Sequence, residues 1–130
     1  MIFRYRIAAL LILTAVLVTA VIPVFAEVVY PNGISGNSLI VNITQSNGQV
    51  KGSATARVKQ NCTAKVTIIV QKNVNDKWVS AACANGGREV GVTCTMTSGY
   101  EYRVYGTLTV YDASGKEVDR ISKYSQVRKY

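Results

Sequence analysis

The chain contains no histidine, and this absence argues against several kinds of chemistry. Without an imidazole, a serine or cysteine nucleophile lacks its usual general base. Several of the acidic residues fall in predicted turns, where aspartate is common for backbone reasons. Glu117 and Asp119 are expected to share one side of a strand, an arrangement typical of a solvated edge. We therefore predict a protein that is not an enzyme and uses no cofactor.

Cysteine is scarce as well, with only Cys62, Cys83 and Cys94. Their spacings include no Cys-x-x-Cys pair, which argues against a zinc site. If the chain is exported, as its N-terminal residues described next indicate, an odd count predicts one disulfide and one remaining thiol. In the alternation of their segments, Cys62 and Cys94 are both expected to point toward the core. We therefore expect these two residues to form the bridge. Cys83 is the alternative partner of Cys62, and a bridge between Cys83 and Cys94 stays open as a third arrangement.

Long apolar runs are confined to the N-terminus. Arg4 and Arg6 precede an apolar run over residues 7–22, and Pro23 and Ala26 follow it. This pattern is typical of a secretory signal peptide cleaved after Ala26. The alternative is an uncleaved anchor, because a 20-residue segment at ~1.5 Å per residue just crosses a bilayer core of ~30 Å. In either case the bulk of the chain is expected outside the cell.

Phenylalanine is absent once the leader is removed. Both phenylalanines, Phe3 and Phe25, lie in it, so the core must come from aliphatic residues, some tyrosine and the single Trp78.

The exported part keeps 13 basic and 7 acidic side chains, a net charge of +6. Such a basic domain is drawn toward polyanions outside the cell, although the same charge also maintains solubility.

Beyond the leader, valine, threonine, isoleucine and tyrosine alternate with clusters of turn residues, which predicts an all-β domain. Asn47-Gly48 is a strong hairpin turn. Seven strands at regular spacing favour an antiparallel β-sandwich. The expected strands cover residues 39–45, 49–59, 64–72, 78–83, 90–96, 100–111 and 117–128. The expected organisation is a signal helix and peptide over 1–26, an irregular segment over 27–37 and the β-sandwich over 38–130.

The last two strands carry a resemblance to a known family. The run Gly99-Tyr100-Glu101-Tyr102-Arg103-Val104, with the hairpin over residues 108–116, resembles fibronectin type III and related Ig-like domains. That resemblance implies a tyrosine corner, in which Tyr100 or Tyr102 bonds upstream backbone. The exported chain also resembles small secreted β-sandwich proteins of Gram-positive bacteria, which share the leader, the Asn-Gly hairpin and the segment with Gln71, Lys72 and Trp78. Trp78 and the cysteine spacing depart from a true immunoglobulin pattern.

The candidate binding surface is the outer side of the late strands. With Val104, Leu108 and Val110 inward, the alternate residues form a face rich in tyrosine, threonine and basic groups, suited to glycans and anionic polymers. The same residue types also stabilise exposed sheets and protect their edges. The candidate residues are Arg103, Tyr105, Tyr111, Lys65, Tyr124 and Arg128.

The predicted function is non-enzymatic binding at or outside the cell surface. The expected partners are a cell-wall polymer, a glycan or an extracellular protein. A specific nucleic-acid partner is not expected, because no recognition motif or dense basic stripe is present. Membrane contact is expected only through an uncleaved leader or an anionic surface. The alternative is a secreted antimicrobial or membrane-active effector, against which the lack of an amphipathic basic helix counts.

Overall fold

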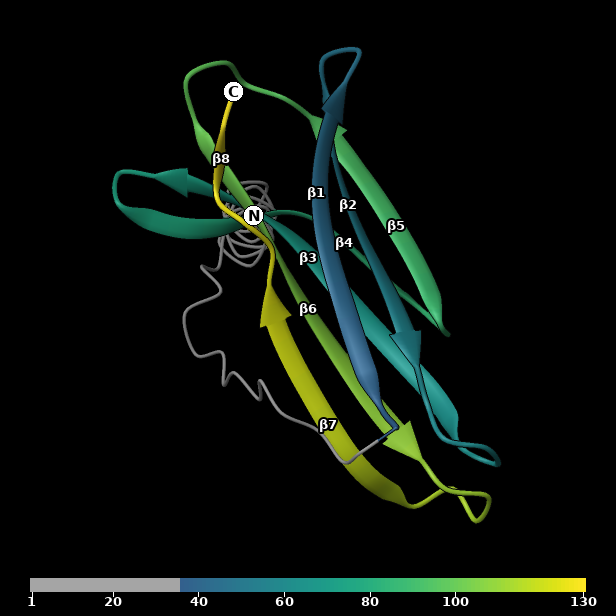
Figure 1. Ribbon diagram of the computed structural model, residues 1–130. Coiled ribbons are helices and arrows are strands. Elements are labelled where there is room, and N and C mark those ends of the chain that lie inside the picture. The colour runs from purple at the N-terminus through teal and green to yellow at the C-terminus, as the bar shows by residue number, and fades with distance from the viewer. Residues whose placement is uncertain (1–35) are drawn as a thin grey trace, which may run out of the picture.

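The computed structural model describes residues 36–130, which form eight strands and no helix (Figure 1). The strands are Ser38–Ser46 (β1), Gln49–Arg57 (β2), Thr63–Val74 (β3), Lys77–Gly86 (β4), Glu89–Thr95 (β5), Glu101–Tyr111 (β6), Glu117–Tyr124 (β7) and Arg128–Lys129 (β8). The predicted signal peptide and most of the predicted irregular segment lie outside the described residues. None of the described residues belongs to a helix that could cross a membrane.

The strands form two antiparallel sheets that pack face to face. One sheet has the order β1-β2-β5, and the other has the order β4-β3-β6-β7, with β8 also paired to β6. In Figure 1 the β1–β2 turn and the C-terminus lie at the same end of the molecule. The prediction of an all-β fold made of two antiparallel sheets is confirmed.

Two tight hairpins set the register of consecutive strands. Asn47 and Gly48 join β1 to β2, and Asn75 and Asp76 join β3 to β4. All four have positive φ, between 51° and 73°, as a two-residue turn of this kind requires. Asparagine, aspartate and glycine tolerate that conformation, so these turns follow directly from the local sequence.

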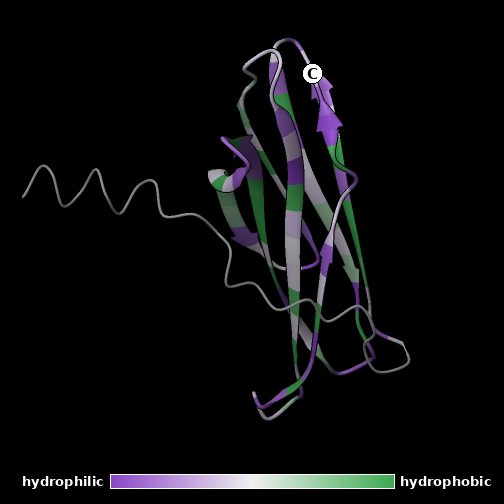
Figure 2. Cartoon of the chain, turned by 90° about the vertical axis from the view of Figure 1, so that its left-hand side faces the viewer, coloured by the Kyte–Doolittle hydropathy of each residue, from purple (hydrophilic) through white to green (hydrophobic). Residues whose placement is uncertain are grey.

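The core lies between the sheets and is built from small and β-branched side chains. Along β3 and β6 alternate residues are fully buried, as the period of two predicts. Figure 2 shows bands of apolar and polar residues along the strands. Tyr102 is the largest fully buried side chain, and its hydroxyl accepts a hydrogen bond of 2.8 Å from the Thr97 backbone N–H. Of the two tyrosines expected to bond upstream backbone, it is therefore Tyr102 that does so.

Two glycines let the sheets approach closely at the centre of this core. A Cβ atom on Gly106 of β6 would lie 2.6 Å from a Val41 methyl group of β1. A Cβ atom on Gly52 of β2 would lie 2.9 Å from methyl groups of Val70 and Val104. Such distances are shorter than any ordinary contact between carbon atoms. The sheets therefore pack at their observed separation only because both positions lack a side chain.

The C-terminal strand differs from the prediction of one continuous strand over 117–128. Ser125 donates its backbone N–H to the Val104 carbonyl at 2.8 Å, and its Oγ accepts the Val104 N–H at 2.8 Å. One residue thus occupies both backbone groups of Val104, and regular pairing stops there. The chain resumes as β8 against the start of β6.

The connection between the expected strands over 78–83 and 90–96 is also shorter than predicted. β4 continues to Gly86, with Ala84 paired to Ile68 and Asn85 paired to Thr67 of β3. Asparagine is common in turns, but here the Thr67 hydroxyl donates a hydrogen bond of 2.6 Å to Asn85 Oδ1. This cross-strand bond helps to keep Asn85 in the sheet. Only two residues then connect β4 to β5 in the other sheet.

We expect Gly106→Ala to lower the free energy of unfolding by about 1–3 kcal/mol, the usual range for an overpacked core. Gly91→Ala is the matched control, because its Cβ would lie 3.4 Å from the flexible Lys51 side chain, an ordinary contact. We expect the control to change stability by less than about 0.5 kcal/mol. Urea unfolding followed by circular dichroism measures both, and equal stabilities would contradict the close approach of the sheets.

Asp112 in the β6–β7 turn predicts an acid-dependent part of the stability. Hydrogen bonds from the Ser114 side chain and then the Lys116 backbone N–H hold its pKa below the ordinary aspartate value. A lowered folded-state pKa stabilises the protein above the unfolded pKa, and this contribution disappears as pH falls through the folded pKa. We expect the stability gap between wild type and Asp112→Asn to close over that range in urea titrations at stepped pH. A gap that is independent of pH would contradict this assignment.

Candidate functional site

The outer face of the five-stranded sheet carries most of the side chains that the sequence pointed to. On β6, Arg103, Tyr105 and Tyr111 alternate with the fully buried residues and are themselves half-buried. Tyr105 pairs with Tyr124 of β7, and Lys65 of β3 pairs with Thr109 of β6, so these side chains emerge on the same side. The register therefore brings three strands into one continuous surface.

Arg103 lies between two aromatic rings on this face. Its guanidinium carbon is 4.2 Å from the ring centroid of Trp78 on β4 and 4.1 Å from that of Tyr124 on β7. Tyr105 extends the group, since its ring centroid lies 5.0 Å from that of Tyr124, with the planes tilted by 43°. We name Trp78, Arg103, Tyr105, Tyr124 and Gln71 the aromatic-arginine cluster.

Gln71 holds Arg103 in place through a hydrogen bond to its guanidinium group. Gln71 is fully buried although Lys65, which has the same parity along β3, is exposed. Its Oε1 accepts a hydrogen bond of 2.6 Å from Arg103 Nε. The pairing of β3 with β4 shifts register between Val70 and Gln71, so the sheet is irregular beside this contact. A buried amide bonded to a charged group is a strong and directional contact. The position and the plane of the guanidinium are therefore fixed.

A second set of polar contacts continues along the same face. The Tyr105 hydroxyl donates to Ser122 Oγ at 3.2 Å, and Thr107 Oγ1 lies 3.2 Å from the same oxygen. These cross-strand bonds hold Tyr105 against β7 and explain why it is only half exposed. The aromatic-arginine cluster is thus supported on both sides and is rigid before any partner binds.

Trp78 and Gln71 are the two members of the cluster that were not predicted as site residues. The sequence nevertheless contains a signal for Trp78, because a two-residue turn at Asn75 and Asp76 requires Asn73 to pair with Trp78. Asn73 has the same parity as Lys65, which was predicted to lie on the candidate binding surface. Counting across the hairpin therefore places Trp78 on the outer face.

Two of the predicted residues lie on the same face but far from the cluster. Lys65 is opposite Thr109, and Tyr111 is near the other end of β6. At ~3.3 Å per residue these positions are roughly 20 and 26 Å from Arg103 along the strand. They are too distant to contact one small group together with Arg103.

Arg128 does not share this face. It pairs with Tyr102, whose side chain is in the core, so the Arg128 side chain emerges at the margin between the sheets. In one continuous strand, Arg128 would point to the same side of the sheet as Tyr124. The interruption at Ser125 shifts the pairing by one residue, so Arg128 points to the other side. Arg128 instead lines a cleft of about 320 Å³ with Tyr124 and with Val41 of β1.

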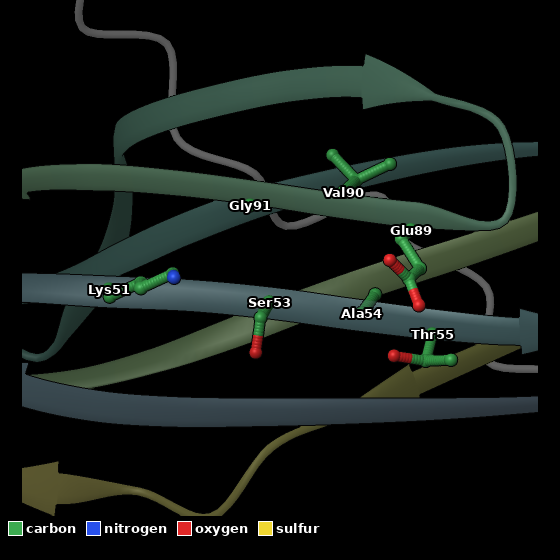
Figure 3. A pocket seen from close by; sticks show the side chains of 7 residues that line it. All are labelled: Lys51, Ser53, Ala54, Thr55, Glu89, Val90 and Gly91. Atoms are coloured by element: carbon green, nitrogen blue, oxygen red, sulfur yellow. The ribbon is translucent and has the colours of Figure 1, made fainter.

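A shallow depression lies on the opposite side of the molecule, over the three-stranded sheet. It has a volume of about 390 Å³ and forms above Gly91 of β5, where no side chain fills the surface (Figure 3). Lys51, Ser53 and Glu89 border it. None of the predicted site residues takes part, and the depression has neither an aromatic wall nor a convergent set of donors.

The carboxylates serve structural contacts. A register shift between Val110 and Tyr111 places Glu117 opposite outward-facing Tyr111 and Asp119 opposite buried Val110, so the prediction that the two acids share one side is wrong. Glu117 pairs with Arg120 at 2.7 Å, and Asp119 Oδ2 accepts from the Asn37 side chain at 2.8 Å. Within residues 36–130 no group of three or more potential ligands could hold a metal ion.

The three cysteines are free in the structure, so neither the predicted Cys62–Cys94 bridge nor a bridge to Cys83 is formed. Cys94 pairs with Val50 beside the β1–β2 turn, whereas Cys62 precedes β3, whose first residue pairs with Tyr111 at the opposite end of the sandwich (Figure 1). Cys83 lies on the outer face of β4. A disulfide requires Cα atoms within about 7 Å, and parity alone does not provide that.

Comparison of the chain with protein-family models, with characterised proteins and with solved structures finds no match. The chemistry of the aromatic-arginine cluster is therefore the basis for assigning a function. Its rings and its fixed cation are suited to binding through stacking and directional hydrogen bonds.

The thiols should differ in reactivity. Cys83 is exposed, whereas burial raises the pKa of Cys94 and lowers its thiolate fraction. We expect iodoacetamide to label Cys83 first and Cys94 last in the native protein, as read by peptide mass mapping. Cys83→Ser should remove the fast phase and leave the slow one unchanged. An unreduced, urea-unfolded protein with a single reactive thiol would reveal a bridge and contradict this order.

Proposed function

We propose that this protein is an exported binding module that acts without catalysis at or outside the cell surface. The aromatic-arginine cluster on the five-stranded sheet is its contact site, and the partner is a wall polymer, a glycan or an extracellular protein. The observation that carries the proposal is the Arg103 guanidinium held between the rings of Trp78 and Tyr124. Export rests on the N-terminal leader in the sequence.

The rigidity of the cluster supports this function. A binding surface whose side chains are already ordered loses little conformational entropy when a partner arrives. Tryptophan and tyrosine offer large, flat and partly polar surfaces with few rotatable bonds. Trp78, Tyr105 and Tyr124 are each half-buried, so part of each remains open to a partner.

We also propose that the sandwich is of the fibronectin type III or Ig-like kind. Two sheets with the orders β1-β2-β5 and β4-β3-β6-β7 support this assignment, as does the bond from the Thr97 N–H to the Tyr102 hydroxyl near the start of β6. Domains of that architecture commonly present binding surfaces on a rigid framework, but architecture alone does not name a partner.

The face is tested by paired substitutions on one surface. We expect the double variant Trp78→Ala, Tyr105→Ala to weaken binding to cell walls of the producing organism by about tenfold or more, equivalent to about 1.4 kcal/mol, because two ring contacts are lost. Tyr111→Ala is the matched control, since it removes a half-buried tyrosine from the same side of β6 at the far end. It should change binding by less than about twofold. Sedimentation with purified walls measures all three proteins after unfolding curves have shown that each is folded.

Two results would oppose the proposal. Unchanged wall binding by the double variant would remove the cluster from the site. Leakage of anionic vesicles caused by the purified exported domain would favour the membrane-active alternative, because a binding module leaves vesicles intact.

A further inference from the structure

The Arg103 guanidinium has only one edge left for a new partner. The ring centroids of Trp78 and Tyr124 lie 4.2 Å and 4.1 Å from its central carbon, and its Nε edge donates to Gln71. The remaining edge carries the Nη1 and Nη2 groups, which are four of the five N–H donors of the side chain. Every buried side-chain nitrogen or oxygen of residues 36–130 has a hydrogen-bond partner, so any unpaired Nη donor of Arg103 is accessible to solvent.

The charge of Arg103 has no counter-ion within the described residues. The single ion pair found there joins Arg120 to Glu117. The acid nearest in sequence, Glu101, accepts a hydrogen bond of 3.2 Å from Asn73. Gln71, which bonds Arg103 directly, is neutral. A cation that is partly removed from water and has no anion beside it within the protein is stabilised when an anion of a partner binds to it.

We propose that the Nη1–Nη2 edge of Arg103 binds an oxyanion carried by a sugar polymer. A carboxylate or a phosphate matches this edge with two parallel N–H···O bonds, and the fixed plane of the guanidinium sets the angle of approach. Trp78 and Tyr124 flank the anion and offer their edges to the adjoining sugar ring. This inference rests on the proposed function and narrows its ligand to an acidic glycan.

Trp78 supplies a direct optical reporter, because it is the only tryptophan in the chain and it contacts the proposed anion site. Oligogalacturonate is the carboxylate probe and inorganic phosphate is the phosphate probe. Neutral dextran oligomers of equal length are the matched control ligand. We expect oligogalacturonate to change Trp78 emission saturably, with an affinity that falls as salt rises, and dextran to bind at least about tenfold more weakly.

Two variants distinguish binding through the planar pair of N–H donors of Arg103 from attraction by positive charge alone. Arg103→Lys keeps the positive charge but loses the planar pair of donors, so we expect the affinity for oligogalacturonate to fall about tenfold or more. Lys65→Gln removes a charge from the same face roughly 20 Å away, and we expect a loss of less than about threefold. Unfolding curves check both variants. Competition by acetate against chloride at equal ionic strength tests the wild type independently, with acetate expected to displace the oligomer.

The outcomes distinguish this inference from the proposed function. If Arg103→Lys binds oligogalacturonate as tightly as wild type, or if dextran binds equally well, the oxyanion assignment is overturned while the aromatic face stands. If phosphate competes and acetate does not, the oxyanion assignment stands and the ligand is a phosphate-bearing polymer. If the wild type binds walls but none of these probes, the acidic-glycan assignment is overturned. If the wild type binds no wall or glycan at all, the proposed function fails with it.

Discussion

The close approach of the two sheets at Gly52 and Gly106 is the constraint on which the rest of the structure depends. A core without phenylalanine fills a narrow space, and these two positions leave no room for a side chain. A slip of one residue in β2 or β6 would bring a side chain into that space and turn the apolar set outward. The glycines therefore secure the register along with the sheet separation.

The same register sets the outer face. Arg103 lies between Tyr102 and Val104, which are both fully buried, and Val104 contacts the position of Gly52 across the core. Because successive residues of a strand point to opposite sides, locking the inner pair fixes where the arginine emerges. The adjacent strand β7 then supplies Tyr124, and β4, which lies beyond β3, supplies Trp78. The rigid core and the proposed binding site are thus two sides of one strand.

Local sequence patterns predicted most of the strands and the half-buried face, while pairings across the fold were harder to predict. The alternation in β3 and β6 and the turn at Asn47-Gly48 depend only on neighbouring residues. The parity of Cys62 and Cys94 gave their inward orientation but not their position along the sandwich, where they lie at opposite ends. Arg128 was misplaced for another reason, since the hydrogen bonds of Ser125 to Val104 interrupt the strand and reverse its parity.

The sequence by itself determined the all-β class, the tight turns, the core of β3 and β6, and the basic, tyrosine-rich character of the late strands. These properties follow from the period of two and from turn chemistry, which act over a few residues. Only the tertiary structure decided that Trp78, Gln71 and Tyr124 meet around Arg103 and that the cysteines stay apart. The cluster and the separation of the cysteines both depend on the order of the strands and on the register in which they pair. Packing across the whole core sets this order and register.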